Sequence, residues 1–367
     1  MLFGGALQGS SGAIFHNESS GGQTITANGS VTGTAGAGIY AQNGSLATGI
    51  TINTAVGTTV SGTVVGIGAD NNGVGAISIT ANGNVSGGTV QGIRATNAGG
   101  ATTVKAYGDV NSTNTHGIYI YGETTSAGDI TVMTGESTYG VTRDTSGIVI
   151  RGDGTTGDVI VNAQGDVTGN GGFGILANNS NGDNVTITTG AYATIAGTTS
   201  NGINANLGNG TGTLSITANG RVYGDNNAIY ARNGSGAYLN ITTHARVAGG
   251  NHGIHGENYS GAMTIIANGN VSGDDNAGIF AQNSGNGLSV TTGAGSLVEG
   301  YDFGIRARNA GSGATTVIAN GDVTGGGDGV YAANTATGSN VIVTAGPGSD
   351  VTGNYRGVTA STTAAAR

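Results

Sequence analysis

A four-residue phrase, Gly-Ile-x-Ala, returns along the whole sequence at nearly constant spacing. Clear copies are GIYA at 38–41, GILA at 174–177 and GIFA at 278–281. With AIFH at 13–16 taken as the first copy, the aliphatic residue of the phrase, here called the anchor, falls at positions 14, 39, 67, 93, 118, 148, 175, 203, 229, 254, 279, 305, 330 and 358. A period of about 26 residues sustained over the whole chain indicates a repeat architecture.

Each repeat contains two further short apolar segments. One is rich in Thr and Ser, such as LSITA at 214–218, and the other centres on Val, such as GDVTG at 321–325. Apolar residues alternate with period two and glycine interrupts every run, which excludes helices. Three short strands in each period predict an all-β fold, a three-sided parallel β-helix of about 14 coils that spans residues 1–367 as a single domain. Stacked coils would form a rod roughly 65 Å long.

The residue after the anchor is expected to face outward, because side chains of a strand alternate between its two faces. Aromatic and arginine residues are frequent at this position, which predicts an exposed ridge. Two interpretations are open: mutual stacking on a solvated sheet, or a binding interface. The column reads Phe15, Tyr40, Gly68, Arg94, Tyr119, Val149, Leu176, Asn204, Tyr230, His255, Phe280, Arg306, Tyr331 and Thr359, and its candidate binding residues are Tyr40, Arg94, Tyr119, Tyr230, His255, Phe280, Arg306 and Tyr331.

Asparagine recurs four residues after the anchor. It tolerates the left-handed conformation of tight turns, and its amide can bond to like amides above and below. This pattern predicts a structural asparagine ladder at a turn. Its members are Asn43, Asn71, Asn97, Asn179, Asn233, Asn258, Asn283, Asn309 and Asn334.

The tripeptide Arg151-Gly152-Asp153 follows the anchor at 148. Arg151 is expected to begin a turn, and Gly152 takes the asparagine-ladder position with a left-handed backbone. Such an exposed corner suits recognition by an integrin-type receptor. The alternative is ordinary turn chemistry in a glycine-rich chain.

Composition and spacing exclude several function classes. A net charge of −9 with a single lysine, Lys105, argues against nucleic acid, which requires clustered positive charge. His252, His255 and Glu257 lie close in sequence but are not expected to converge on a metal. Asp274 and Asp275 would form a solvated turn, and a weak cation site is the alternative there. No period exceeds 30 residues, which leaves no long loop to wall an active-site cleft. We therefore expect no catalytic residues, no cofactor and no metal.

The alternation of Gly-Ile-x-Ala with ANGDVTG-type strands resembles the passenger region of bacterial autotransporters, in particular AIDA-like and pertactin-like adhesins. The resemblance covers essentially the whole chain and implies a right-handed, pectin-lyase-like β-helix. It further implies secretion, display on a Gram-negative cell surface and a role in adhesion or aggregation. Passengers of the pertactin type can also carry Arg-Gly-Asp.

Two departures from this family concern the ends of the sequence. The start, MLFGGALQGSSG, is unlike a secretory signal peptide, and no translocator barrel follows TASTTAAAR. The chain is therefore interpreted as a segment of a longer passenger, attached to a membrane only through a C-terminal barrel that it lacks.

The functional prediction is a non-enzymatic cell-surface adhesin or structural rod. Its expected partner is a protein or glycan on another cell, and self-association is also expected. Two alternatives remain: a carbohydrate-active, pectin-lyase-like β-helix enzyme, and a purely structural spacer or filament-forming solenoid.

Overall fold

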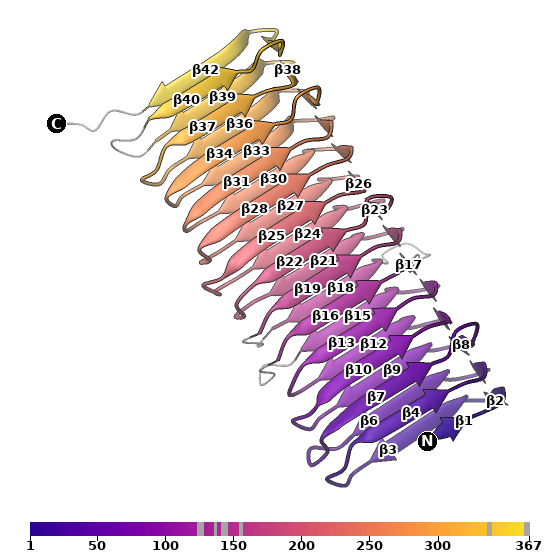
Figure 1. Cartoon of the computed structure of the whole chain (residues 1–367). Coiled ribbons are helices and arrows are strands. Elements are labelled where there is room, and N and C mark those ends of the chain that lie inside the picture. The colour runs from indigo at the N-terminus through magenta and orange to yellow at the C-terminus, as the bar shows by residue number, and fades with distance from the viewer. Residues whose placement is uncertain (123–127, 136–137, 141–145, 154–156, 336–339, 363–367) are drawn as a thin grey trace. The chain divides into compact units, whose positions relative to one another are not determined.

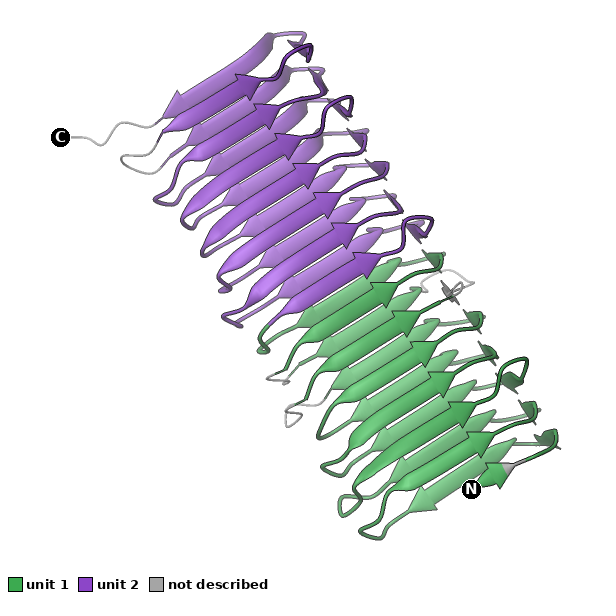
Figure 2. Cartoon of the chain, in the orientation of Figure 1, with its two compact units in different colours: residues 1–183 green, residues 184–367 purple. Residues whose placement is uncertain are grey.

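The computed structural model describes residues 1–122, 128–135, 138–140, 146–153, 157–335 and 340–362. Within these residues the chain forms strands β1 to β42 and no helix. The strands make a right-handed parallel β-helix of about 13 turns with about 26 residues per turn, as predicted (Figure 1). Two compact units divide the chain, Met1–Asp183 and Asn184–Arg367 (Figure 2).

Unit 1 contains three parallel sheets, and each turn contributes one strand to each sheet. Sheet A consists of β1 (Leu2–Phe3), β4 (Gln23–Ala27), β7 (Gly49–Thr54), β10 (Ala76–Ala81), β13 (Thr102–Ala106), β16 (Ile130–Thr134) and β19 (Val159–Ala163). Sheet B consists of β2 (Leu7–Gly9), β5 (Val31–Gly33), β8 (Thr59–Gly62), β11 (Asn84–Gly87), β14 (Val110–Ser112), β17 (Thr138–Gly140) and β20 (Val167–Gly169). Sheet C consists of β3 (Ala13–Asn17), β6 (Ile39–Asn43), β9 (Ile67–Asn71), β12 (Ile93–Asn97), β15 (Ile118–Gly122), β18 (Ile148–Gly152) and β21 (Ile175–Asn179).

Unit 2 repeats the same three-sheet arrangement. Its sheet A consists of β22 (Val185–Thr189), β25 (Thr213–Ala218), β28 (Tyr238–Thr243), β31 (Ala262–Ala267), β34 (Gly287–Thr292), β37 (Thr315–Ala319) and β40 (Val341–Ala345). Sheet B consists of β23 (Thr194–Gly197), β26 (Arg221–Gly224), β29 (Val247–Gly249), β32 (Val271–Gly273), β35 (Leu297–Gly300), β38 (Asp322–Gly325) and β41 (Val351–Gly353). Sheet C consists of β24 (Ile203–Leu207), β27 (Ile229–Asn233), β30 (Ile254–Asn258), β33 (Ala277–Asn283), β36 (Phe303–Asn309), β39 (Asp328–Asn334) and β42 (Arg356–Thr362).

The core of each unit is a set of stacked aliphatic columns. In sheet C the anchor and the alanine two residues later both face inward, as at Ile175 and Ala177, which are fully buried. Sheet A contributes a parallel column that includes Ile187 and Ile216, paired in register. Each buried aliphatic side chain stabilises the fold by about 2 kcal/mol. The alternation of buried and half-buried residues along the strands therefore determines which side chains are left for the surface.

The glycine before the anchor is required by close contact between neighbouring turns. A Cβ on Gly304 would lie 2.5 Å from Val323 Cγ1 and 2.6 Å from the carbonyl oxygen of Gly329. Gly38 has the corresponding neighbours, Val60 Cγ1 and the Gly66 carbonyl oxygen, each at 2.7 Å. Steric proximity rather than an unusual backbone angle thus explains why glycine recurs here.

The predicted register is wrong by one residue in the first turn. Ala13, and not Ile14, pairs with the anchor Ile39, so Phe15 lies opposite the inward-facing Ala41. Ile14 occupies the outward column and is 49% exposed. A Cβ on Gly12 would lie 2.5 Å from the Gly38 carbonyl oxygen, the same contact that the later glycines make.

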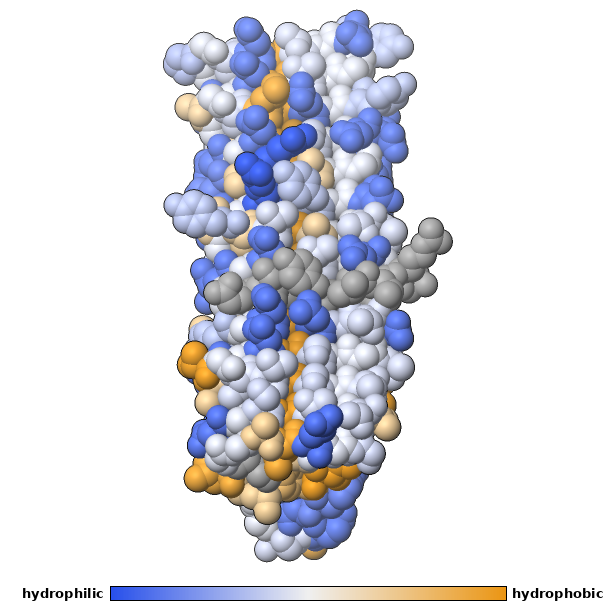
Figure 3. Space-filling view, turned by 90° about the vertical axis from the view of Figure 1, so that its right-hand side faces the viewer, coloured by the Kyte–Doolittle hydropathy of each residue, from blue (hydrophilic) through white to orange (hydrophobic). Residues whose placement is uncertain are grey.

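The surface is mostly hydrophilic. On the face shown in Figure 3, hydrophobic residues lie in a narrow band and at scattered positions among polar ones. This distribution fits outward positions occupied mainly by Thr, Ser, Asn and Gly, and it makes the clustered aromatic and charged side chains of sheet C distinctive.

Candidate functional site

Two outward columns line each sheet C. The first, one residue after the anchor, contains the predicted ridge residues, which pair from turn to turn in register within each unit. These side chains are half-buried, not exposed as predicted, because neighbouring rings and guanidinium groups cover one another. Val149 in the same column is only 1% exposed. The half-buried ridge residues are Tyr40, Arg94, Tyr119, Tyr230, His255, Phe280, Arg306 and Tyr331.

The second outward column, three residues after the anchor, was not singled out from the sequence. It carries charged side chains that interact with the first column, among them Asp70, Arg232 and Glu257. The strand alternation that identified the first column applies equally to this one. Charge complementarity between the two columns was the signal that could have revealed it.

The unit 1 cluster consists of Tyr40, Asp70 and Arg94, which come from three successive strands, β6, β9 and β12. The Tyr40 hydroxyl donates to Asp70 Oδ2 at 2.6 Å, and the Arg94 guanidinium forms an ion pair with the same oxygen. Arg94 also lies over the Tyr40 ring, 6.0 Å from its centroid. The cluster thus joins an aromatic, an acidic and a basic side chain on one small area.

Burial raises the pKa of Tyr40 to about 12, and the hydrogen bond to Asp70 acts in the same direction. The tyrosine is therefore a hydrogen-bond donor at neutral pH. A cavity of about 280 Å³ adjoins the cluster, lined by Tyr40, Arg94 and the valines Val64, Val65 and Val90 with Gly36 and Ala37. Such a cavity offers an apolar wall with a cationic edge.

The unit 2 cluster is formed by Tyr230, Arg232, His255, Glu257 and Tyr259, with Glu257 at its centre. His255 Nε2 lies 3.1 Å from Glu257 Oε1. The hydroxyls of Tyr230 and Tyr259 each donate to Glu257 Oε2 at 3.3 Å, and Arg232 Nε is 3.9 Å from that oxygen. The Arg232 guanidinium also lies over the Tyr259 ring, 5.1 Å from its centroid. Several donors thus converge on one carboxylate.

Burial controls the protonation of this cluster. It raises the pKa of Tyr230 to about 12, reinforced by the Glu257 carboxylate. Burial lowers the pKa of His255, although the neighbouring Glu257 opposes the shift. It also lowers the pKa of His252 to about 4, and the nearby His255 adds to this effect. Both imidazoles are therefore neutral at pH 7.

An aromatic stack extends the unit 2 cluster along the first column. His255 contacts Phe280 edge-to-face at 4.7 Å between ring centroids, and Arg306 lies 5.2 Å above the Phe280 ring. Arg306 also lies 5.3 Å from Phe303, which in turn contacts Tyr331 at 5.8 Å. Contacts of this kind are worth about 0.5–1.5 kcal/mol each. The stack therefore orders the side chains of this surface.

A polar column beside the ridge was also missed from the sequence. It lies two residues before the anchor, where side chains accept hydrogen bonds from backbone N–H groups of the next turn. His252 Nδ1 accepts from Ala277 N at 3.2 Å, and Asn201 Oδ1 accepts from Asn227 N at 3.0 Å. In unit 1, His116 Nδ1 accepts from Ser146 N at 3.2 Å, and His116 stacks on Tyr119. This column ties the ridge to the connections between sheets B and C.

The asparagine column lies inside the wall, at the ends of the sheet C strands rather than within the turns. Asn283 donates to Asn309 Oδ1 at 3.0 Å and accepts from Asn258 Nδ2 at 2.8 Å. It also donates to the Gly287 carbonyl oxygen at 2.8 Å, which closes the following turn. Every member of the column is at most 1% exposed: Asn43, Asn71, Asn97, Asn179, Asn233, Asn258, Asn283, Asn309 and Asn334. These amides hold the turns and do not reach solvent.

The tripeptide Arg151-Gly152-Asp153 is divided between strand and turn. Arg151 is exposed, but it is a strand residue of β18 and does not begin the turn as predicted. Gly152 occupies the asparagine column between Gly122 and Asn179 in extended conformation, so the predicted left-handed backbone is wrong. Asp153 is half-buried, and its carboxylate accepts from Ser180 Oγ at 3.5 Å. Residues 154–156, which follow, lie outside the described residues.

Within the described residues, no group of three or more His, Cys, Asp and Glu side chains is arranged to hold a metal ion. The same residues contain no helix with the length and hydropathy that a membrane span requires. Asp274 and Asp275 lie in the connection after β32, where their backbone N–H groups bond to Gly249 and Gly250 of the preceding turn.

Comparison with known proteins does not assign a function to the chain. No family model matches the chain, and neither a curated protein nor a solved structure matches it.

Proposed function

We propose that the chain is the repetitive segment of a cell-surface passenger of the autotransporter type, which acts as a non-enzymatic adhesin. Its binding surface is the outward face of sheet C. A protein or glycan on another cell is the partner, and the chain is displayed on the surface of a Gram-negative bacterium.

One observation carries this proposal. In unit 2, Tyr230, His255, Phe280 and Arg306 occupy the same outward position on successive strands and contact one another in turn. Phe303, which lies two residues before the anchor, links Arg306 to Tyr331. Tyrosine, tryptophan and arginine are the residues that most often dominate binding energy at interfaces. A stack that is already ordered loses little conformational entropy when a partner binds.

An exposed edge of this surface lies at Arg232 and Tyr259. The Arg232 side chain is 49% exposed and Tyr259 is 46% exposed. A cavity of about 290 Å³ lies beside them, lined also by Asn206, Asn209 and Ser235. These groups can donate to and accept hydrogen bonds from a partner without disrupting the half-buried stack.

Attachment of cultured cells to surfaces coated with the purified chain tests the proposal. The double variant Arg232→Ser with Tyr259→Ser should reduce attachment at least threefold. The matched control is Tyr192→Ser with Arg221→Ser, which removes an exposed tyrosine and an exposed arginine that lie outside sheet C. Equal attachment by both double variants, with unchanged circular dichroism, would refute the assignment of the binding surface.

The tripeptide provides a second contact in this proposal, because Arg151 is exposed and, among the described residues, the Asp153 carboxylate makes a long contact of 3.5 Å to Ser180 Oγ. Asp153→Glu retains the charge but displaces the carboxylate. It should lower attachment of integrin-bearing cells and leave attachment of integrin-deficient cells unchanged. Equal attachment of both cell types to this variant and to the native chain would remove the tripeptide from the proposal.

A carbohydrate-active enzyme is the second candidate, and the His255–Glu257 pair with two tyrosine hydroxyls favours it. Glycoside hydrolysis by the usual mechanism needs two carboxyl groups, about 5–9.5 Å apart. The cluster contains one, Glu257. Release of reducing sugar from polysaccharides, abolished in Glu257→Gln, would favour this candidate over the adhesin.

A further inference from the structure

Sheet A of unit 2 presents a regular array of hydroxyl groups to solvent. On each strand from β22 to β37, two half-buried residues that are two positions apart face outward, and successive strands pair them in register. Most of these residues are Thr or Ser. The array consists of Thr186 and Thr188, Ser215 and Thr217, Asn240 and Thr242, Thr264 and Ile266, Ser289 and Thr291, and Thr316 and Ile318.

The outward hydroxyls keep their capacity for hydrogen bonds. Among the described residues of unit 2, no hydroxyl of the array is bonded to another protein group. Inward-facing threonines of the same sheet differ, because Thr189 Oγ1 accepts from the Gly220 backbone N–H at 3.2 Å and Thr292 Oγ1 accepts from the Gly321 backbone N–H at 3.0 Å. A hydroxyl offers one donor and two acceptor sites. The array is therefore left to bond to water.

The array is also neutral and stiff. Strands β22, β25, β28, β31, β34 and β37 contain no charged residue, and Tyr238 lies at the border of the array, at the start of β28. A charged side chain such as lysine holds a strong hydration shell of its own, and no such shell interrupts these strands. Thr and Ile are β-branched, which restricts their χ1 angles. The hydroxyl and methyl groups are thus ordered before a ligand binds.

The spacing of the array is close to that of a crystalline water network. Neighbouring strands lie about 4.8 Å apart, and outward residues on one strand lie about 6.6 Å apart. In a tetrahedral network with O···O distances of about 2.75 Å, two waters bonded to the same neighbour are about 4.5 Å apart, and the layers repeat every ~7.3 Å. From β22 to β37 the smaller mismatch adds up to about 1.5 Å, roughly half the diameter of a water molecule. The strands follow one another along unit 2 with little change of direction, so twist does not disrupt the match (Figure 1).

We propose that the outward face of sheet A in unit 2 binds ice. Its hydroxyl groups occupy positions close to those of water oxygens in the outermost layer of the lattice. Ordering a water molecule from the liquid has an entropic cost, whereas the waters of ice are already ordered. This surface lies on a different sheet from the one proposed for cell attachment, and it adds a second, inorganic binding partner.

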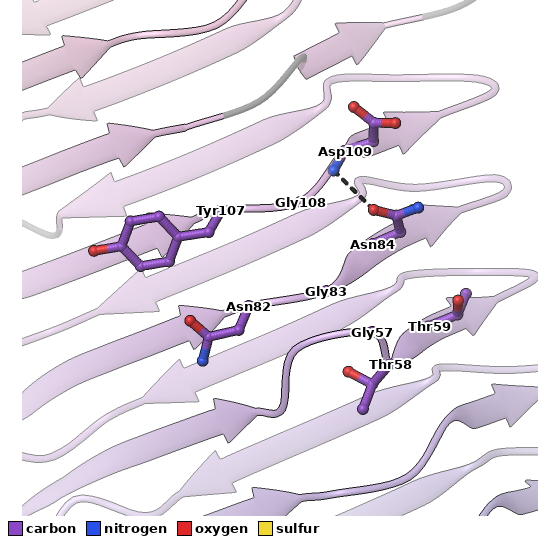
Figure 4. A pocket seen from close by; sticks show the side chains of 9 residues that line it. All are labelled: Gly57, Thr58, Thr59, Asn82, Gly83, Asn84, Tyr107, Gly108 and Asp109. Carbon is purple, nitrogen blue, oxygen red and sulfur yellow. Dashed lines mark hydrogen bonds between the residues drawn. The ribbon is translucent and has the colours of Figure 1, made fainter.

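Unit 1 does not carry the same array. Lys105, Met133 and Ile160 occupy the corresponding outward positions on β13, β16 and β19. The turns after sheet A in unit 1 contain a cavity of about 360 Å³. The Tyr107 ring extends to one side of its glycine floor and Asp109 lies on the other, so these groups do not converge on one ligand (Figure 4).

Partition of the full chain between slowly growing ice and the remaining liquid tests the proposal. Protein concentration is measured in the melted ice and in the liquid, with serum albumin as a protein that growing ice excludes. The native chain should be enriched in the ice at least about threefold over albumin. In the double variant Thr217→Lys with Thr242→Lys, two strongly hydrated ammonium groups interrupt the array and should lower incorporation about threefold or more.

The matched control is Ala248→Lys with Ser272→Lys, which adds the same charges at half-buried outward positions that are paired in register on sheet B. It should enter the ice as the native chain does, and circular dichroism should show the same fold for both double variants. Exclusion of the native chain to the same extent as albumin, or equal incorporation of the native chain and the sheet A variant, would overturn the proposal.

Sedimentation with crystalline cellulose distinguishes ice from another rigid lattice of hydroxyl groups. The native chain should stay in the supernatant. Binding to cellulose that the sheet A variant loses would assign the array to a polysaccharide and overturn the proposal. None of these outcomes bears on cell attachment through sheet C, which the Arg232 and Tyr259 variants test separately.

Discussion

At the scale of single residues, the asparagine column combines two tasks in one side chain. The amide N–H groups of Asn283 satisfy a turn carbonyl and the next amide, while its oxygen receives a bond from the previous turn. No water reaches it, since Asn283 is fully buried. A buried polar group of this kind stabilises the fold only while all its partners remain.

Replacement of Asn283 by Ala should therefore be costly. It removes the side-chain partner of the Gly287 carbonyl oxygen and of the Asn258 Nδ2 group, and each unsatisfied buried group costs about 1–3 kcal/mol. We expect the free energy of unfolding to fall by about 2–4 kcal/mol in urea titrations. The neighbouring outward-facing variant Gln282→Ala should change it by less than about 0.5 kcal/mol. Similar decreases in the free energy of unfolding of both variants would contradict a stabilising role for the Asn283 amide.

His252 should make the stability of unit 2 sensitive to acid. Burial lowers its pKa from 6.5 to about 4, so the unfolded chain binds a proton below pH 6.5 that the folded chain does not bind. Stability is complete above pH 6.5 and decreases as the pH falls toward 4. The expected decrease from this residue is on the order of 2 kcal/mol.

The variant His252→Asn tests this assignment. Asparagine at the same position in an earlier turn, Asn201, accepts the equivalent backbone N–H, so the Ala277 N–H should keep an acceptor. Chemical unfolding between pH 7 and pH 4 should then show a smaller loss of stability than in the native chain. An unchanged pH dependence would assign the acid sensitivity to other groups.

At the scale of strands and turns, the spacing between neighbouring turns depends on the glycine before the anchor. In Gly304→Ala the new Cβ would approach Val323 and the Gly329 carbonyl to about 2.5 Å. Crowding of this kind costs about 1–3 kcal/mol. Ala228 occupies the same position in another turn, so the chain can adjust to one methyl group.

Thermal unfolding checks this expectation. Gly304→Ala should unfold at a lower temperature than the native chain, while Gly21→Ala, where no atom lies within 4 Å of the added Cβ, should not. Equal melting temperatures for Gly304→Ala and the native chain would show that the turns are not in close contact there.

Strand positions were predictable from the sequence because apolar alternation and the repeated phrase determine which residues face inward. The exception, Ile14, arose because the most hydrophobic residue was taken as the anchor, whereas the glycine at position 12 marks the true register. The solvent exposure of the outward-facing side chains was less predictable from the sequence. The ridge residues face outward as expected, but contacts between turns, such as that of His255 with Phe280, cover much of their surface.

At the scale of the whole molecule, a repeat makes the fold far easier to infer than the function. Every period repeats the same constraint, so a single recurring phrase predicts a parallel β-helix with about 26 residues per turn. The proposed function rests instead on positions where the repeat is broken, such as Asp70 and Glu257. Their significance depends on neighbours one turn away, about 26 residues along the chain, which sequence spacing alone did not bring to attention.

Register between successive turns is the central claim of this account, and disulfide formation measures it most directly. The chain has no cysteine, so any intramolecular disulfide must join the two introduced cysteines. Thr217 and Thr242 are paired in register on neighbouring strands of sheet A, whereas Thr217 and Asn240 are offset by two residues. Neighbouring strands lie about 4.8 Å apart, within disulfide range, but the offset pair is separated by about 8 Å, beyond the limit for a disulfide.

Under mild oxidation, Thr217→Cys with Thr242→Cys should form an intramolecular disulfide, detected by mass spectrometry after proteolysis. Thr217→Cys with Asn240→Cys should remain reduced. Failure of the first pair to close, or closure of the offset pair in its place, would contradict the in-register parallel β-helix.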